Sequence, residues 1–440
     1  MATATDRVID PITTFSVWFI GLVAVLGIVA LVMLEAVIHQ LRHGLVVTDL
    51  ASWGTQEGVT WGIYIGTFEW FAGMAVGCIA VVGFIRYREL NRYDVIARIG
   101  EIWGLISGLS AAYLIVLDLG RPDRVLNILT AWVVTVQYSP LAWDVTFVTG
   151  LLVLTSTMLI LSLRRDFSAM ELDELPIHAR LLGTVLTAGY QSDEDEKLAS
   201  MLRWLGLALL ILAFTGGMVP GWLLGVVGAQ AGYYGGIAGI SFLAGGLLTG
   251  VAAIALISGI LRVLYGWDDL LPTDVFVGVG KALTLFGFVY LVILFNEMLP
   301  KLFPMAPLAE SRIGEAMLYG HFATDFWLAI AAVAIPVVIL AAFRKRMIVR
   351  GVGLALVSVP MLWAVFVKKQ LTVIEPLMYP SGLPYEVGTY VPTLVEWVIV
   401  IGSIAVAILL FAIATRLVPM GRPPIRTTGS TTDATTEVSD

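Results

Sequence analysis

Residues 59–85 read VTWGIYIGTFEWFAGMAVGCIAVVGFI and carry one charged side chain, Glu69. An apolar helix of about 18 or more residues is long enough to cross the hydrocarbon core of a membrane. We therefore predict that this segment spans a bilayer. An ionisable group at membrane depth is costly and persists mainly where it faces a bundle interior or a water path, so Glu69 is the first candidate functional residue.

The rest of the chain repeats this pattern. Nine further apolar runs lie at about 15–41, 99–117, 140–163, 203–226, 237–261, 276–299, 322–343, 351–367 and 393–415. Of the 440 residues, 58% are hydrophobic and 13% are charged, and the charged share is about half that of a soluble domain. The expected fold class is all-α, a polytopic integral membrane protein of ten helices, and a soluble globular domain is excluded.

Lysine and arginine predict the orientation. Counted with the N-terminus inside, the inner segments hold 18 of them and the outer loops seven, and Lys281 lies within a helix. The positive-inside rule then places both termini in the cytoplasm and the chain in the cytoplasmic membrane. The seven outer residues include Lys368 and Lys369, which follow the ninth apolar run.

Three regions are predicted: a cytoplasmic N-terminus at 1–14, a transmembrane domain at 15–416 and a disordered cytoplasmic tail at 417–440. WFAG at 70–73 is echoed by FLAG at 242–245. This echo suggests two related four-helix bundles, at about 59–226 and 237–367, with a flanking helix on either side.

Composition limits the cofactors. The single cysteine, Cys78, excludes an intrachain disulfide, a thiolate-ligated iron–sulfur cluster and a structural zinc site. A haem held between helices needs paired axial histidines, but His39 and His43 point the same way from one helix, and His178 and His321 lie outside the helix interiors. We expect no haem, cluster or metal in this chain and no nucleic-acid partner. The net charge of −7 comes largely from acidic clusters such as Asp193 to Glu196 and says more about soluble loops than about nucleic acid.

Acidic residues gather near the predicted outer helix ends: Glu35, Asp118, Asp144, Glu297, Asp325 and Glu396. For Glu297, Asp325 and Glu396 the favoured interpretation is an interfacial side chain that reaches outside water. Glu69 lies ten residues into its predicted helix, roughly 15 Å and thus near mid-membrane. It is either a structural hydrogen-bonding group or a step in a proton path.

Two segments meet across one outer loop. DLGRPDR at 118–124 closes the third helix, and SPLAWD at 139–144 opens the fourth. In the functional interpretation they form a polar gate, in which Asp118 and Asp144 exchange protons while Arg121 orients them or a ligand carbonyl. In the alternative, the charged pairs only fix the loop.

Four aromatic residues at the start of the second helix share one face by their spacing: Trp61, Tyr64, Phe68 and Phe71. Near an interface such residues usually serve packing or an aromatic belt. Beside Asp118 and Asp144 this face also suits a flat ring with two carbonyl groups, which describes a quinone. His39 is a further candidate beside the gate, although an interfacial role is simpler.

These pieces resemble the NrfD/PsrC family, the membrane subunits of polysulfide reductase-type, hydrogenase-linked and related respiratory complexes. The matching stretches are Trp61-Gly62, FAGMAVG at 71–77, DLGRPDR at 118–124, SPLAWD at 139–144 and YVPTLVE at 390–396. The ten helices and the last motif look like the longer branch of the family, seen in hydrogenase-linked and alternative complex III subunits.

The resemblance implies a quinone or quinol, with menaquinone the expected type, near the outer face of the first bundle, and no haem. It implies docking of a ferredoxin-like iron–sulfur subunit linked to a molybdopterin enzyme, a hydrogenase or a multihaem cytochrome. Position by position it carries over onto Trp61, Tyr64, Phe68, Asp118, Arg121, Trp143 and Asp144. Glu69 matches no family motif and stays a proton-path candidate by its depth alone.

The predicted function is that of a membrane subunit in a respiratory oxidoreductase complex, which exchanges electrons between quinone and an iron–sulfur partner. The direction of electron flow and any proton translocation are left open. One alternative is a secondary transporter, which also has repeats, buried acids and glycine-interrupted helices. The other is a membrane anchor without a quinone site, in which the polar gate is only loop packing.

Overall fold

The computed structural model describes residues 4–13, 16–50, 59–191, 193–228, 230–233, 235–303, 308–348, 351–379 and 387–422. These residues form α-helices and short 3₁₀ turns and include no strand, which confirms the all-α prediction. Within the same ranges, ten helices are long and apolar enough to cross a membrane. The chain is a multi-pass membrane protein. Most of the predicted tail, from residue 423 on, lies outside the described residues.

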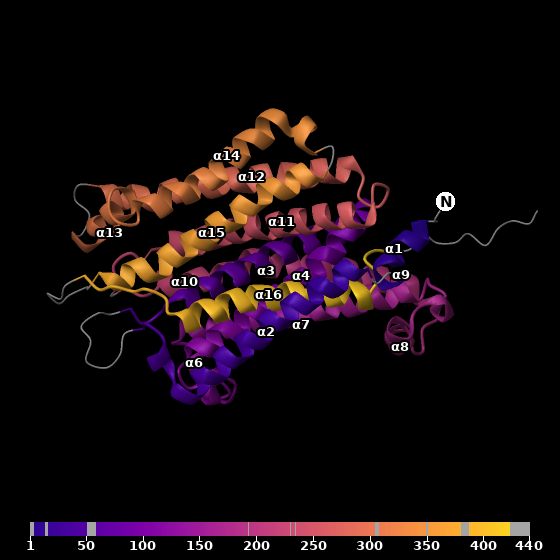
Figure 1. Cartoon of the computed structure of the whole chain (residues 1–440), viewed down its shortest axis with the longest axis horizontal. Coiled ribbons are helices and arrows are strands. Elements are labelled where there is room, and N and C mark those ends of the chain that lie inside the picture. The colour runs from indigo at the N-terminus through magenta and orange to yellow at the C-terminus, as the bar shows by residue number, and fades with distance from the viewer. Residues whose placement is uncertain are drawn as a thin grey trace, which may run out of the picture.

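The spans run side by side along the long axis in Figure 1. They are α2 (Val17–His43), α3 (Ile63–Tyr87), α4 (Asp94–Asp118), α7 (Pro140–Phe167), α9 (Glu194–Thr215) continued by α10 (Val219–Gly225), α11 (Ile237–Tyr265), α12 (Thr273–Met298), α14 (Ala323–Ile348), α15 (Val352–Met378) and α16 (Leu394–Leu417).

Shorter helices lie at the two ends: α1 (Ala4–Thr13), α5 (Asn127–Thr130), α6 (Trp132–Thr135), α8 (Ile177–Leu186) and α13 (Leu308–Leu318). Figure 1 shows α6, α10 and α13 at one end and α1 and α8 at the other. We call these the outer and inner ends, after the sides predicted from the charges.

The ninth span is longer than predicted. It was expected at about 351–367, but α15 continues to Met378, so Lys368 and Lys369 lie inside the helix, only 4% and 7% exposed. Their assignment to an outer loop was wrong, and the outer count of lysine and arginine falls from seven to five (7 − 2). The apolar pattern stops at these lysines, but carboxylates on neighbouring helices pair with them and the helix continues.

The helices contact one another in the same order twice. In the first set, α4 and α9 each lie against both α3 and α7. In the second set, α12 and α15 each lie against both α11 and α14. This is the order that two related four-helix bundles would show, and their extents at about 59–226 and 237–367 remain a prediction.

The two sets meet where α3 packs against α11 through glycines. A Cβ atom on Gly73 would lie 3.2 Å from Cα of Gly246, and one on Gly77 would lie 2.8 Å from Cα of Gly250. Each helix therefore carries a small-x-x-x-small pair, which lets two backbones approach closely within a membrane. Both helices run from the outer to the inner end, so the contact is parallel.

We expect Gly77→Ala to destabilise the protein by roughly 1–3 kcal/mol, because the added methyl group meets backbone that can move only if α3 and α11 separate. The midpoint of thermal unfolding in detergent should fall. Gly27→Ala on α2 is the matched control, since a Cβ atom there has no heavy atom within 4 Å. Equal midpoints for the two variants would contradict the tight α3–α11 contact.

Candidate functional site

A cavity of about 350 Å³ lies in the outer half of the molecule, bordered by α3, α11, α12 and α15. Apolar and aromatic side chains, among them Leu224, Phe242 and Tyr290, form part of its wall. Its ionisable lining residues are Glu69, Glu297, Lys301, Glu310, Lys368 and Lys369, together with the phenols of Tyr233 and Tyr290. A concave, partly apolar space with a few convergent polar groups is the usual form of a small-molecule site.

Glu69 forms a buried ion pair on the wall of this cavity. It is 1% exposed, and its Oε2 accepts a hydrogen bond from Lys369 Nζ at 3.0 Å. The same ammonium lies 4.0 Å from the centroid of the Phe242 ring, a cation–π contact. The second carboxylate oxygen, Oε1, is buried and has no hydrogen-bond partner in the described part of the chain.

The structure moves Glu69 closer to the outer end than predicted. Because α3 begins at Ile63 rather than near residue 59, Glu69 lies six residues into the helix, roughly 9 Å from its start. Gly73 follows Glu69 by one turn, and Gly246 follows Phe242 by one turn. The glycine contact between α3 and α11 therefore lies directly on the inner side of the cavity.

A second ion pair lines the same cavity. Lys368 Nζ donates to Glu297 Oε1 at 2.8 Å and to the Thr372 hydroxyl at 2.8 Å. The Ser241 hydroxyl donates to the other oxygen of Glu297 at 2.8 Å. The Glu297 side chain is 12% exposed. The interpretation of Glu297 as an interfacial acid reaching outside water was wrong, because it pairs with a lysine inside the bundle.

The predicted gate residue Arg121 lies on the surface. Its guanidinium pairs with Asp123 at 2.9 Å, and the two side chains are 64% and 59% exposed. This hydrogen-bonded pairing lowers the pKa of Asp123 below its usual value. The described contacts of Arg121 therefore support loop fixation more than the orientation of a ligand.

The two gate acids belong to different surroundings. Asp144, near the start of α7, is 1% exposed and close enough to Glu69 for their charges to interact. Asp118, at the end of α4, is half-buried and interacts instead with Glu396. On each acid Oδ1 is buried without a hydrogen-bond partner among the residues described. Asp144 is thus the gate acid that interacts with Glu69, although it is not among the described residues that line the cavity, and Asp118 is the one that interacts with Glu396 at the start of α16.

Of the four aromatic residues predicted to share one face, Tyr64, Phe68 and Phe71 lie in α3, but Trp61 does not. Trp61 precedes α3 and stacks on Tyr233, with ring centroids 6.4 Å apart. Tyr64 instead donates to Gln40 Oε1 on α2 at 2.7 Å, and Phe68 is fully buried. The predicted common face was wrong for Trp61, because the helix begins two residues after it.

Tyr233 links Trp61 to the cavity. It lines the cavity, and its hydroxyl donates to the backbone carbonyl of Val373 on α15. Burial, and to a lesser extent the negative charge of Glu69, raise the pKa of Tyr233 above its usual value. Tyr233 is therefore a neutral hydroxyl group beside the Glu69 carboxylate.

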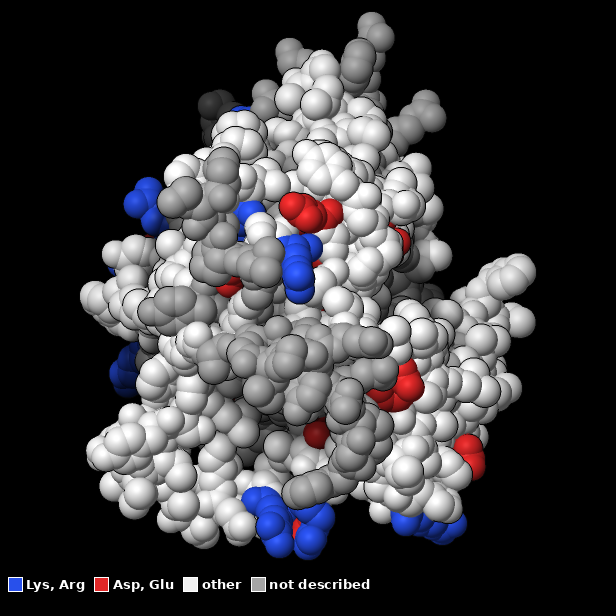
Figure 2. Space-filling view, turned by 90° about the vertical axis from the view of Figure 1, so that its left-hand side faces the viewer, with Lys and Arg blue, Asp and Glu red and all other residues white. Residues whose placement is uncertain are grey.

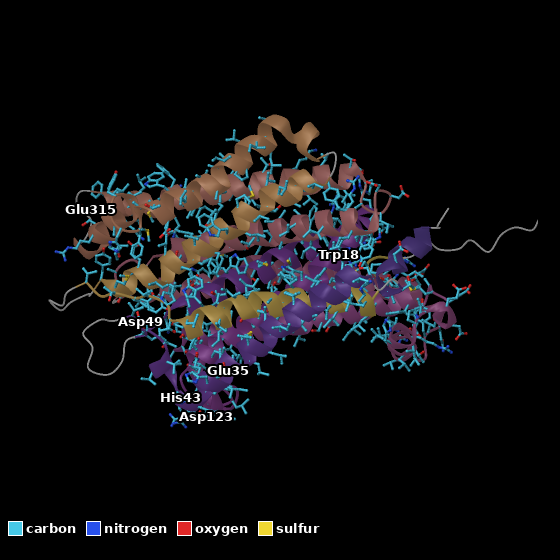
Figure 3. The ribbon with its side chains drawn as sticks, viewed as in Figure 1. Trp18, Glu35, His43, Asp49, Asp123 and Glu315 are labelled. Atoms are coloured by element: carbon cyan, nitrogen blue, oxygen red, sulfur yellow. The ribbon has the colours of Figure 1, made fainter. Side chains whose placement is uncertain are left out.

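Two further candidates have local partners. The centroid of the His39 ring lies 4.3 Å from that of the His43 ring. Figure 3 labels His43 and Glu35 at the rim of the bundle. His39 is not among the described residues that line the cavity. Trp143 Nε1 donates to the carbonyl of Val136 at 2.5 Å. Trp143 thereby anchors the loop between α4 and α7.

The stretch YVPTLVE at 390–396 connects two helix starts. The Tyr390 hydroxyl donates to Glu396 Oε1 at 2.5 Å and accepts from the backbone N–H of Ile63 at 2.9 Å. Thr393 and Glu396 form a capping box at the start of α16. Glu396 is fully buried, so its interpretation as an interfacial acid was also wrong. Burial, followed by the hydrogen bond to Glu396, raises the pKa of Tyr390.

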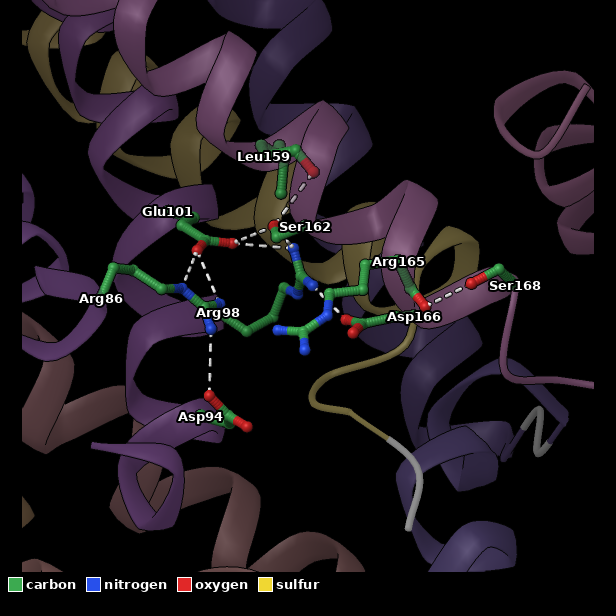
Figure 4. Close-up of polar contacts among 9 residues, drawn as sticks. All are labelled: Arg86, Asp94, Arg98, Glu101, Leu159, Ser162, Arg165, Asp166 and Ser168. Carbon is green, nitrogen blue, oxygen red and sulfur yellow. Dashed lines mark hydrogen bonds and ion pairs between the residues drawn. The ribbon is translucent and has the colours of Figure 1, made fainter. Parts of the chain in front are cut away.

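A network of charged residues joins α3, α4 and α7 at the inner end (Figure 4). Glu101, fully buried, accepts from Arg86 at 2.8 Å and from Arg98 at 2.7 Å. Arg98 also pairs with Asp166, and Arg86 pairs with Asp94 at 3.0 Å. Because each of these charges has an opposite partner, the network can be buried without an isolated ion.

Comparison with known proteins identifies the family of this chain. A family model described as "Polysulphide reductase, NrfD" matches residues 51–374. The chain belongs to the NrfD family. This NrfD chain is 24% identical over 417 residues to a selenate reductase subunit of Mesobacillus selenatarsenatis, covering 90% of this chain and 93% of that protein. It is 27% identical over 238 residues to a putative dimethyl sulfoxide reductase membrane subunit of Halobacterium salinarum, covering 54% and 51% of the two chains.

Sequence reasoning missed several residues of the cavity in this NrfD chain: Tyr233, Lys301, Glu310, Lys368 and Lys369. The adjacent Lys368 and Lys369 were the signal available in the sequence, because they directly follow a predicted span. The acids Glu69 and Glu297, which lie in other predicted helices, had no partner assigned from the sequence. Tyr233 lies between spans, and nothing in its local sequence marks it.

We expect Tyr390→Phe to destabilise the protein by about 1–3 kcal/mol, since it leaves the buried Glu396 oxygen and the Ile63 N–H without this partner. Thermal unfolding of the detergent-solubilised protein measures the change. Tyr138→Phe, at a side chain 81% exposed, should leave the midpoint unchanged. A Tyr390→Phe variant as stable as Tyr138→Phe would show that these hydrogen bonds do not tie α3 to α16.

Proposed function

We propose that this chain is the quinol-oxidising membrane subunit of a reductase complex. Membership of the NrfD family and the two relatives named as reductase subunits support its place in such a complex. Quinone interaction is general among membrane subunits of this family. Since the complex is a reductase, quinol is the electron donor in this proposal.

The unpartnered Oε1 of Glu69, buried on the wall of the cavity, is the observation that carries this proposal. A buried carboxylate oxygen without a partner is costly, and a ligand hydroxyl would satisfy it. The cavity is within the usual size range of small-molecule sites, and Phe242 and Tyr290 offer apolar surface for a flat ring. The residues present therefore fit a quinone headgroup.

Each residue has a distinct role in this proposal. Bound quinol would supply two electrons and two protons. Glu69 accepts a proton at Oε1, while Lys369 keeps the carboxylate in position through Oε2. Asp144, within electrostatic range of Glu69, is the second proton acceptor. Tyr233, braced by Trp61, forms a neutral wall of the cavity.

Asp118 is assigned a separate role in proton exchange at the outer end. It lies within electrostatic range of Tyr64 and Glu396, and its Oδ1 lacks a partner among the described side chains and backbone. These groups lie at the outer ends of α3, α4 and α16. Replacing Asp118 by Asn should slow turnover less than replacing Glu69 by Gln, because Asp118 does not line the cavity in the described structure.

The electrons would pass to a partner subunit at the outer end. Because the chain has one cysteine, an iron–sulfur partner must supply the clusters in this proposal. A further catalytic subunit would supply the substrate site. Figure 2 views this end, where charged side chains form small separate groups of both signs. The segment between α4 and α7 exposes three large side chains, Leu126 (64% exposed), Val133 (71%) and Tyr138 (81%). Such exposed apolar surface is suited to docking of a partner.

We also propose that both termini are cytoplasmic. With Lys368 and Lys369 inside α15, the predicted inner segments carry 18 lysines and arginines and the outer loops five. The excess of lysine and arginine lies on the predicted inner side, in the sense of the positive-inside rule. The cavity would then open toward the outer side of the cytoplasmic membrane.

Glu69→Gln should lower the rate of quinol oxidation by the purified complex about a hundredfold, because a positioned proton acceptor is lost. The measurement is steady-state turnover with a soluble quinol, together with the quinone content of the purified complex. Asp325→Asn, at an exposed acid at the start of α14, is the control and should retain wild-type turnover.

The same assay separates the alternatives. A chain that serves only as an anchor keeps full quinol oxidation in Glu69→Gln and contains no quinone. A transporter binds no quinone and instead moves a solute across proteoliposomes. Either result would overturn the proposed function.

A further inference from the structure

Two lysines on α15 bind carboxylates on two different helices. Lys369 pairs with Glu69 on α3 at 3.0 Å, and Lys368 pairs with Glu297 on α12 at 2.8 Å. All four residues line one cavity. The proposed function uses the first pair and leaves the second without a role.

The two pairs are electrostatically connected. The charges of Lys368 and Glu297 act on Glu69 as well as on Lys369. When Glu69 gains a proton, Lys369 loses its counter-charge, and the cavity gains one positive charge beside a second buried lysine. In a medium of low dielectric this repulsion favours release of a proton from the same cavity.

Ionisable groups continue from the second pair to the outer end. Glu297 lies one residue before the end of α12, and Lys301 follows it in the 3₁₀ turn Leu299–Leu302. Glu375 lies seven residues beyond Lys368 on α15, roughly 10 Å farther out. It is fully buried, lies within electrostatic range of Lys301 and Lys368, and neither of its carboxylate oxygens has a partner among the residues that the structure describes.

We propose that Glu297 and Lys368 form a proton relay that carries protons from Glu69 to the outer aqueous side, with Lys301 and Glu375 as the next groups outward. The proposal rests on the proposed function, because quinol oxidation supplies the protons. Per quinol, two electrons pass to the iron–sulfur partner and two protons leave. For a proton that takes this route, the O–H bond formed at Glu69 breaks again as the proton moves to the Glu297–Lys368 pair.

Ser241 and Thr372 are positioning residues for this relay. The Ser241 hydroxyl donates to Glu297 Oε2, and the Thr372 hydroxyl accepts from Lys368 Nζ, each at 2.8 Å. These bonds fix the two side chains at the cavity wall while leaving their charges paired. A pair retained only for stability would not need to line the space that contains Glu69.

The test uses the whole complex, purified with its partner subunits and reconstituted in vesicles. After rapid mixing with quinol, absorbance of the iron–sulfur partner reports electron transfer, and an external pH dye reports proton release. The variant is Glu297→Gln with Lys368→Met, which removes both charges together and leaves no unpaired buried ion. Glu315→Gln, an exposed acid on α13 labelled in Figure 3, is the matched control.

The relay predicts that proton release in the double variant slows about a hundredfold. Quinone affinity, measured separately by equilibrium binding, should stay within about twofold of wild type, and added small weak acids should partly restore proton release. Proton release at the wild-type rate would overturn the relay, as would loss of quinone binding, which would place the pair in the binding site. Wild-type complex that binds no quinone would overturn the proposed function itself, so the two failures are distinguishable.

Discussion

The close parallel contact of α3 with α11 is the constraint on which the rest of the structure depends. Gly73 and Gly77 face Gly246 and Gly250, and a side chain at any of these positions would meet the opposite helix. Within lipid, close backbone approach replaces the hydrophobic drive that joins helices in water. One turn outward from this contact, α3 carries Glu69 and α11 carries Phe242 in place of a glycine. The cavity lies there, between α3, α11, α12 and α15.

The distribution of buried charge follows from that geometry. Isolated ions are costly at membrane depth, and Lys369 and Lys368 on α15 accordingly pair with Glu69 on α3 and Glu297 on α12. At the inner end Arg86 and Arg98 both pair with Glu101, which ties α3 to α4. At the outer end the pairs line a cavity and leave Glu69 Oε1 without a described partner. The inner arrangement suits a rigid tie between helices, and the outer one suits exchange of protons with a ligand.

The sequence predicted the fold well because hydropathy reports burial in lipid directly. All ten spans, the all-α class and the family were confirmed. Hydropathy failed where charge was compensated by distant residues: α15 continues past Lys368 and Lys369 because Glu297 and Glu69 lie opposite them. No local pattern in the chain could show that pairing, since about 70 and 300 residues separate the partners.

The candidate site was predictable only in part. Depth in an apolar helix singled out Glu69, and motif resemblance singled out Asp144, which the structure brings within electrostatic range of each other. Arg121 was a misleading signal, because a conspicuous loop arginine can pair with its neighbour Asp123 at the surface. Tyr233 escaped notice because its position depends on how the loop before α11 folds back over the cavity.

The central claim is that quinone binds in the cavity between α3, α11, α12 and α15. Photolabelling of the purified complex with a light-activated quinone analogue, followed by peptide mapping, tests it most directly. The account predicts label on the outer parts of α3, α11 or α15, reduced by excess unlabelled quinone. The account is contradicted if excess unlabelled quinone displaces label only from α2, α4 or α16. It is also contradicted if excess quinone displaces no label at all.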